Sequence, residues 1–271
     1  MAGRFKAVGF DMDGTFLKTR VDYDRLNNAD RRVLERHNIP FEQIDFGGRA
    51  KRLRTPIKNW LEANGRIDEW PQIYREIEDE CLDSECEFVS EAVPFSGSVE
   101  SLPLIKEKGL KVGILTRGGL EYARRALGPL FDEFDFVMGR DHSFYDDAKP
   151  SPIAMRQFAQ GLGVDPKEII YVGDSLTDWQ SARDAGAVFV GVLTGSCTEE
   201  DWLKADPDMI IVDRAGDVVE LLRYSERRDV GPSPTRIKRL WRGRRPLRFT
   251  GFRLRACGPC PGSCCAPDRR I

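Results

Sequence analysis

Short apolar segments that alternate with helix-like segments are the feature that most restricts the fold of this 271-residue chain. The expected strands are residues 5–10, 110–115, 134–138, 169–172, 187–192 and 209–212. Runs that are apolar throughout are typical of parallel strands that are buried on both faces. The segments between most of these runs have helical spacing, and several end in glycine. The pattern predicts an α/β fold whose parallel sheet is covered by helices on both sides.

Two aspartates stand directly after the first expected strand, in the sequence Asp11-Met12-Asp13-Gly14-Thr15. Because successive strand residues point to opposite faces, Asp11 and Asp13 can present their carboxylates on the same side. Two close carboxylates repel each other unless a proton or a cation relieves the repulsion, and a divalent metal with oxygen ligands does so. An ordinary turn at a strand end also uses aspartate and glycine, so these residues alone leave both interpretations open.

Three more polar motifs follow in order along the chain. They are Ile114-Leu115-Thr116-Arg117-Gly118, Ala148-Lys149-Pro150 and Gly173-Asp174-Ser175-Leu176-Thr177-Asp178. In open parallel sheets, ligands bind beyond the carboxyl ends of the strands, where these motifs are expected to lie. Together with Asp-x-Asp-Gly-Thr they resemble the four motifs of the haloacid dehalogenase-like (HAD) superfamily, chiefly Mg²⁺-dependent phosphatases. The chain looks most like the phosphoglycolate phosphatase-like subgroup, which has a helical cap.

The resemblance implies a doubly wound, Rossmann-like core formed by residues 1–16 and 92–223, with an all-helical cap, residues 17–91, inserted into it. We expect three helices in the cap, over residues 22–37, 49–64 and 69–88, and no strand. Pro56 is expected to kink or split the second helix. Such a cap would close over the site and exclude water, although a helical subdomain without this role is an alternative.

The resemblance also assigns roles in catalysis. Asp11 would be the nucleophile that forms an aspartyl-phosphate, and Asp13 would be the general acid and then the base that activates water. The dehalogenases of the family lack the second acid, so Asp13 argues against dehalogenation. Lys149 would neutralise the charge of the phosphoryl group, although an isolated lysine is more often a solvated surface residue.

Phosphate binding would use the loop that opens the helix after residues 110–115. The Thr116 hydroxyl and the free N–H groups near Gly118 suit a phosphate oxygen, although Thr116 could instead be an ordinary helix cap. Family members often have asparagine at the position of Arg117, so that contact differs here. The arginine could itself meet an anion.

Mg²⁺ is the cofactor that the resemblance implies. Its ligands would be Asp11, the backbone carbonyl of Asp13 and Asp174, while Asp178 would orient the metal's waters or Lys149. So few protein ligands suit Mg²⁺, which keeps several waters. Taken singly, Asp174 and Asp178 could also cap the helix that follows them.

The expected activity is Mg²⁺-dependent hydrolysis of a small phosphate monoester, similar to phosphoglycolate or a sugar phosphate. Gly48, Arg49 and Lys51 form a basic stretch of the cap that could meet a second anionic group of the substrate, or be a solvated helix face. Phosphomutases of the family share all four motifs, so phosphoryl transfer within a sugar is an alternative.

The C-terminal tail, residues 224–271, differs in composition from the rest of the chain. It has 13 Lys and Arg against 3 Asp and Glu, although the whole chain has a formal net charge of −2. Cys257, Cys260, Cys264 and Cys265 lack the paired spacing usual in zinc sites. We expect a linker or a poorly ordered extension. A protein that binds nucleic acid through this basic tail is the alternative from another functional class.

Composition also bounds the location and the partners. No signal peptide and no run of roughly 20 apolar residues stands out. Cys81, Cys86 and Cys197 are scattered, as in proteins whose thiols stay reduced. We therefore expect a cytoplasmic enzyme, monomeric or homodimeric, whose partner is a small phosphorylated substrate rather than a membrane.

Overall fold

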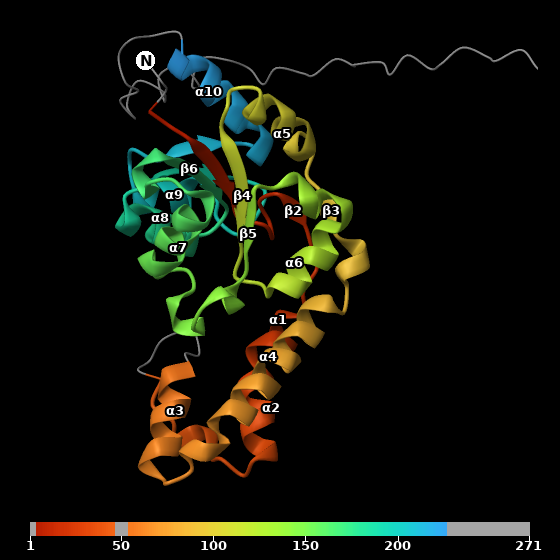
Figure 1. Ribbon diagram of the computed structural model, residues 1–271, viewed down its shortest axis with the longest axis vertical. Helices are drawn as coiled ribbons and strands as arrows, with labels where there is room; N and C mark the ends of the chain where they lie inside the picture. Colours follow the sequence, from red (N-terminus) through yellow and green to blue (C-terminus); the bar gives the residue numbers. More distant parts are fainter. Residues whose placement is uncertain (1–3, 47–53, 227–271) are drawn as a thin grey trace, which may run out of the picture.

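The computed structural model describes residues 4–46 and 54–226 (Figure 1). Within these ranges, a six-stranded parallel sheet has the order β5-β4-β1-β6-β7-β8. The strands are β1 (Ala7–Phe10), β4 (Lys111–Leu115), β5 (Phe136–Met138), β6 (Ile169–Gly173), β7 (Val188–Val192) and β8 (Ile210–Val212). They coincide with the six expected apolar runs, so the predicted α/β fold is confirmed.

The strand order explains why the first motif is central. The chain begins in the middle of the sheet at β1, continues outward through β4 and β5 on one side, and then through β6, β7 and β8 on the other. This reversal of direction beside β1 leaves a crevice at the carboxyl ends of the strands, where doubly wound sheets bind ligands.

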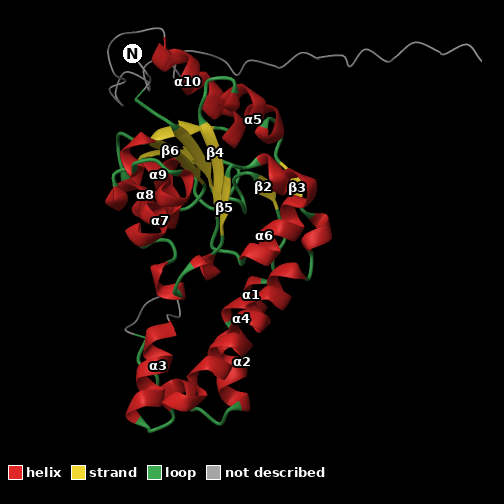
Figure 2. Cartoon of the chain, viewed as in Figure 1, coloured by secondary structure: helices red, strands yellow, loops and turns green. Residues whose placement is uncertain are grey.

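Helices cover both faces of the sheet (Figure 2). One hydrophobic cluster joins β1 to α5 (Ser98–Lys106), α6 (Leu120–Leu127) and α10 (Val218–Glu226). A second cluster joins the sheet to α7 (Pro152–Leu162), α8 (Leu176–Ala185) and α9 (Glu199–Ala205). Helix α9 was not predicted. It is short and buries a single residue, Trp202, so the sequence has no apolar repeat there.

Close packing at the centre of the sheet depends on two paired glycines. Gly9 of β1 lies opposite Gly113 of β4. A Cβ atom at either position would lie within 2.7 Å of the Phe158 ring of α7. Because such contacts do not occur in folded proteins, the absence of side chains at both positions lets α7 approach the sheet beneath the first motif.

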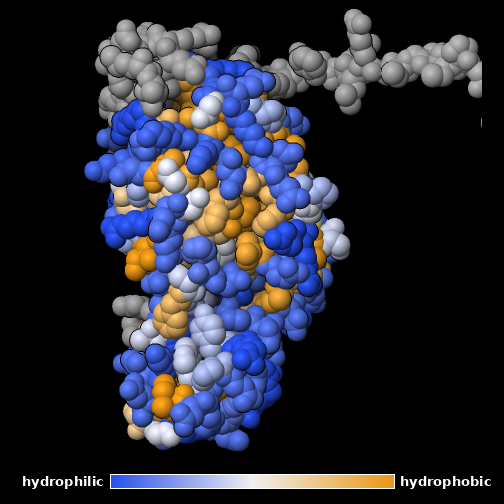
Figure 3. Space-filling model, in the orientation of Figure 1, coloured by the Kyte–Doolittle hydropathy of each residue, from blue (hydrophilic) through white to orange (hydrophobic). Residues whose placement is uncertain are grey.

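In the described part of the insertion that follows the first motif there are four α-helices. They are α1 (Tyr23–Asn27), α2 (Ala29–Arg36), α3 (Arg54–Ala63) and α4 (Trp70–Cys86). They share a hydrophobic cluster of their own, which includes Val33, Leu61 and Ile77. On the face seen in Figure 3, hydrophilic side chains cover most of this helical insertion. The insertion therefore buries its apolar residues within itself.

A short pair of strands joins the insertion to the core. β2 (Leu17–Lys18) pairs in antiparallel fashion with β3 (Val93–Pro94), so the chain leaves and re-enters the core through one stem. The prediction that residues 17–91 contain no strand was wrong for these two residues. A strand of two residues produces no alternating pattern, and its partner lies far away in the sequence.

The helix boundaries of the insertion also need correction. The helix expected over residues 22–37 is interrupted at Asn28, although Asp22 does cap its start by accepting from Arg25 N. Pro56 is the third residue of the described part of α3, which continues unbroken to Ala63. None of the described helices has the length and apolar character that crossing a membrane requires.

Candidate active site

Three of the predicted aspartates meet at the carboxyl end of the two central strands. Asp11 follows β1, Asp174 follows the adjacent strand β6, and Asp178 lies in the first turn of α8. All three are buried, and one carboxylate oxygen from each lies within 4.8 Å of the others. Burial raises the pKa of the Asp11 carboxyl well above its ordinary value, against the opposing charge of Lys149. Three carboxyl groups share one lysine here, so full ionisation of the cluster would need a further positive charge.

Lys149 is the single basic residue at the centre of this cluster. Its Nζ donates to Asp11 Oδ1 and to Asp178 Oδ1, both at 2.6 Å, and to the backbone oxygen of Leu115 at 2.7 Å. The Tyr171 hydroxyl lies 2.8 Å from the same nitrogen and itself donates to the Leu115 oxygen. Burial alone would lower the pKa of the ammonium, but the charges of Asp11 and Asp178 raise it. Lys149 is thus held as a buried cation.

A loop after β7, which sequence reasoning did not identify, fixes Asp174. Ser196 donates to Asp174 Oδ2 from its backbone N at 2.7 Å and from its hydroxyl at 2.9 Å. A Cβ atom at Gly195 would lie 2.0 Å from that same oxygen. Gly14, whose φ is +79°, adopts a conformation that favours glycine and also lies against this carboxylate. The sequence could have indicated this loop, because it follows the strand expected over residues 187–192 and so lies at the same edge of the sheet as the motifs.

Asp13 lies beside the three-carboxylate cluster and has separate partners. Its Oδ1 accepts from the Thr19 hydroxyl at 2.8 Å and from the Tyr122 hydroxyl at 2.6 Å. Its Oδ2 accepts from the Thr116 hydroxyl at 3.3 Å. Among the described residues, the side chain of Asp13 is not part of the group of three acids that could hold a metal, and the contribution of its backbone carbonyl stays a prediction.

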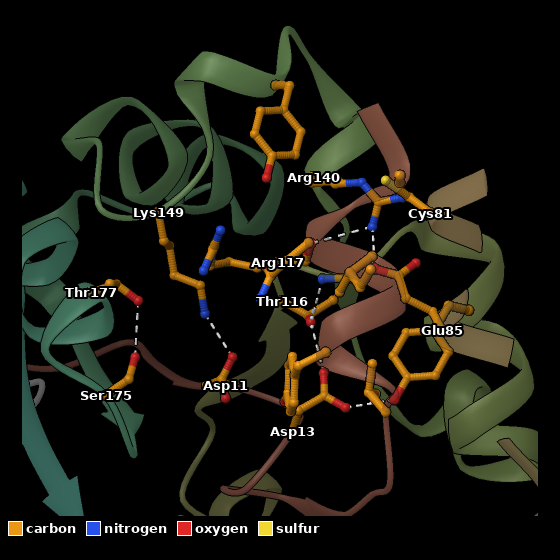
Figure 4. A pocket seen from close by; sticks show the side chains of 18 of the residues that line it. Asp11, Asp13, Cys81, Glu85, Thr116, Arg117, Arg140, Lys149, Ser175 and Thr177 are labelled. Atoms are coloured by element: carbon orange, nitrogen blue, oxygen red, sulfur yellow. Dashed lines mark hydrogen bonds and ion pairs between the residues drawn. The ribbon is translucent and has the colours of Figure 1, made fainter. Parts of the chain in front are cut away.

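The loop after β4 brings the predicted phosphate-binding residues to the same cavity. The Thr116 hydroxyl is buried and accepts from Gly118 N at 2.9 Å. Arg117 extends between Lys149 and Arg140 in Figure 4, and its Nε is buried without a hydrogen-bond partner among the described residues. The other basic side chains that line the cavity, Arg54, Arg140 and Lys149, each pair with a carboxylate. Among the described basic residues of the cavity wall, Arg117 is therefore the one with a buried N–H free to meet an anion.

The cavity lies between the core and the helical insertion and has a volume of about 720 Å³. Its walls include Tyr23, Arg54 and Glu85 from the insertion as well as the motif residues. Arg140, which follows β5, donates to both Glu78 and Glu85 of α4. These ion pairs tie the insertion to the core, and their members come from motif-free segments that sequence reasoning did not identify. The predicted substrate residues Gly48, Arg49 and Lys51 lie outside the described residues.

Comparison with known proteins identifies the family. The model of the haloacid dehalogenase-like hydrolases matches residues 5–186. The chain belongs to this family and is an enzyme of the hydrolase class, so the predicted family is confirmed.

Named relatives cover most of the chain. It is 28% identical to the N-acetylmuramic acid 6-phosphate phosphatase of Pseudomonas aeruginosa, over 81% of this chain and 95% of the relative. It is 30% identical to the phosphoglycolate phosphatase of Thiobacillus denitrificans, over 76% of this chain and 91% of the relative. The solved β-phosphoglucomutase of Clostridium difficile shares the fold, with a TM-score of 0.54 at 20% identity, over 82% of this chain and 97% of that one.

Proposed function

We propose that this phosphoric monoester hydrolase is a Mg²⁺-dependent phosphatase that acts on a small phosphate ester through a phosphorylated Asp11. The observation that carries the proposal is the buried cluster in which Lys149 Nζ joins Asp11 and Asp178 beside Asp174. A cluster with a purely structural role would not need an open cavity in front of Asp11. Here the cavity reaches Asp11, and the relatives named above are phosphatases.

The donor set fits a hard divalent cation. Three buried carboxyl groups share one ammonium, so full ionisation of the cluster would need a further positive charge, and oxygen is the ligand that Mg²⁺ prefers. Asp11, Asp174 and the backbone carbonyl of Asp13 would hold the ion, with Asp178 orienting its waters. When bound, the metal would supply electrostatic stabilisation of the phosphoryl oxygens.

Each residue of the site has a separate role in the proposed reaction. Asp11 attacks phosphorus, while Asp13 gives a proton to the leaving oxygen and later takes one from the attacking water. The Thr116 hydroxyl, which accepts from Gly118 N at 2.9 Å, donates to one phosphoryl oxygen, and Arg117 pairs with the charge that remains. Lys149 orients Asp11 and favours its ionised form against the effect of burial, because its ammonium lies 2.6 Å from the Asp11 carboxylate.

The helical insertion is the proposed cap, with boundaries at residues 17 and 91. It contributes walls to the cavity and is tied to the core by Arg140, Glu78 and Glu85, so its position bears on access to Asp11. The basic stretch at Gly48, Arg49 and Lys51 remains a prediction for contact with the rest of the substrate.

The test is phosphate release from a panel of esters, with Mg²⁺ and with EDTA. The panel contains 2-phosphoglycolate, N-acetylmuramic acid 6-phosphate and hexose phosphates, because the relatives are named for esters of these kinds. Release that requires Mg²⁺ and stops in EDTA supports the proposal, and the ranking of kcat/KM names the substrate class. Interconversion of hexose phosphates without net phosphate release would instead identify a mutase, and a folded protein with neither activity would refute both.

The location and the assembly state belong to the same proposal. Cys81, Cys86 and Cys197 are free thiols, as expected for a cytoplasmic enzyme. A monomer or a homodimer is expected, and sedimentation of the full chain measures this directly.

A further inference from the structure

Two hydroxyl groups that belong to none of the four motifs converge on one oxygen of Asp13. The Tyr122 hydroxyl, from α6, donates to Asp13 Oδ1 at 2.6 Å. The Thr19 hydroxyl, from the residue after β2, donates to the same atom at 2.8 Å. Asp13 Oδ2 accepts only the longer bond of 3.3 Å from Thr116 among the hydrogen bonds of the described residues. Oδ1 is therefore restrained by two short hydrogen bonds, whereas Oδ2 is restrained by one longer bond.

The fold positions the Tyr122 ring tightly. The side chain is 1% exposed and belongs to the hydrophobic cluster beneath α6. A Cβ atom at Gly118 would lie 2.6 Å from the ring, so a glycine at this point of the phosphate-binding loop is what lets the ring reach Asp13. Burial, followed by the charge of Asp13, raises the pKa of Tyr122 far above its ordinary value, so its hydroxyl keeps its proton and remains a donor.

We propose that Tyr122 is a positioning residue for Asp13. Its hydroxyl, together with that of Thr19, occupies Oδ1 and fixes the carboxyl group so that Oδ2 is the oxygen that exchanges the proton. The inference rests on the proposed function, because it concerns the proton transfers of that reaction.

Both chemical steps depend on this orientation. In the first step, an Asp11 oxygen bonds to phosphorus as the ester P–O bond breaks, and Asp13 gives its proton to the departing oxygen. In the second step, the oxygen of water bonds to phosphorus as the bond to Asp11 breaks, and Asp13 takes the proton. A carboxyl group free to change rotamer would spend less time within hydrogen-bond reach of either oxygen.

Tyr122→Phe tests the inference, because it removes the hydroxyl and keeps the ring. Two substrates are compared through kcat/KM, which reports the steps up to phosphoenzyme formation. One is an alkyl phosphate, whose leaving oxygen needs a proton, and the other is p-nitrophenyl phosphate, whose leaving group needs little protonation. We expect kcat/KM to fall about tenfold to a hundredfold for the alkyl ester, a part of the usual contribution of a general acid, and clearly less for the aryl ester.

Tyr74→Phe is the matched control. Tyr74 lies on α4, stacks on Phe144 and is not among the residues that line the cavity. The same loss of one hydroxyl at that site should leave kcat/KM unchanged for both esters. Equal losses for the two esters in Tyr122→Phe, or behaviour like that of Tyr74→Phe, would overturn the inference.

A double-mutant cycle separates positioning from general damage. In an Asp13→Asn background, Tyr122→Phe should change the residual hydrolysis of the alkyl phosphate by less than about twofold, against the loss of about tenfold or more expected in the wild-type background, since residues that act through one group are not additive. Additive losses would contradict the inference. If Tyr122→Phe does not fold, Thr19→Val removes the other donor to Oδ1 from a half-buried residue, and it must show the same selective loss for the alkyl ester. A wild-type enzyme that releases no phosphate refutes the proposed function instead.

Discussion

Replacing Lys149 with methionine should destabilise the folded protein far more than a typical lysine substitution. The side chains of Lys149, Asp11 and Asp178 are 1%, 9% and 2% exposed, and the ammonium lies 2.6 Å from each carboxylate. Removing one partner of a buried ion pair costs about 3–5 kcal/mol, because the remaining charge stays buried and unpaired. Asp11 and Asp178 both lose their partner here. Either carboxylate can take up a proton instead of staying charged, and this limits the loss of stability to about 1.4 kcal/mol for each unit by which its pKa is raised. We therefore expect the free energy of unfolding to fall by about 3–5 kcal/mol in EDTA near pH 8.

The measurement is urea unfolding followed by circular dichroism, with Lys106→Met as the matched control. Lys106 pairs with Glu133 at 3.0 Å, but the two side chains are 39% and 58% exposed, so this substitution should cost at most about 1 kcal/mol. Mg²⁺ should restore part of the stability of Lys149→Met, because an ion that binds only the folded state stabilises it. If the two variants lose the same free energy in EDTA, Lys149 is not the buried counter-ion that we describe.

Three further predictions concern the remaining residues of the site and its surroundings. Asp11→Asn should abolish turnover and keep the cooperative unfolding of the wild type, since it changes one atom of the nucleophile; retained turnover would exclude Asp11 from that role. Asp174→Ala should move the Mg²⁺ activation curve to higher concentration and lower the maximal rate, whereas an unchanged titration would exclude it as a ligand. Burial raises the pKa of the Cys81 thiol to about 11. Alkylation mapped by mass spectrometry at pH 8 should therefore be much slower at Cys81 in the folded protein than in urea, and equal rates would contradict its burial.

The parts of the site that the sequence predicted are those that follow strand ends. Asp11, Thr116 and Asp174 each come directly after an apolar run, and adjacent parallel strands bring such residues together. Lys149 was predicted through the family motif, and its burial with two carboxylates is a property of the fold that no local pattern carries.

The partners of these residues could not be predicted, because each comes from a distant segment. Tyr122 lies on a helix whose apolar face already explains an aromatic residue, so nothing in the local sequence marks its hydroxyl. Ser196 stands in an ordinary polar loop after β7. Arg140 and Glu85 are 55 residues apart and meet only because α4 returns to the core. These residues share only their location near the site in the folded chain, and the periodicity of the sequence does not report such long-range contacts.

The six-stranded sheet was predicted more completely than the shortest strands and helices. The six parallel strands bury apolar runs, and burial is what periodicity reports. The two-residue strands of the stem and the short helix α9 bury too little to leave a pattern. The break at Asn28 between α1 and α2 was also missed, because the apolar residues on its two sides keep the spacing of one continuous helix.

The most direct test of the central claim is rapid acid quenching during turnover, followed by mapping of the phosphorylated peptide. With Mg²⁺ and the best ester of the panel, we expect phosphate to appear on the peptide that contains Asp11 before the first turnover is complete, and not in Asp11→Asn or in EDTA. Phosphate release by the wild type without any phosphorylated Asp11 at these times, or a phosphorylated peptide elsewhere in the chain, would contradict the proposed mechanism.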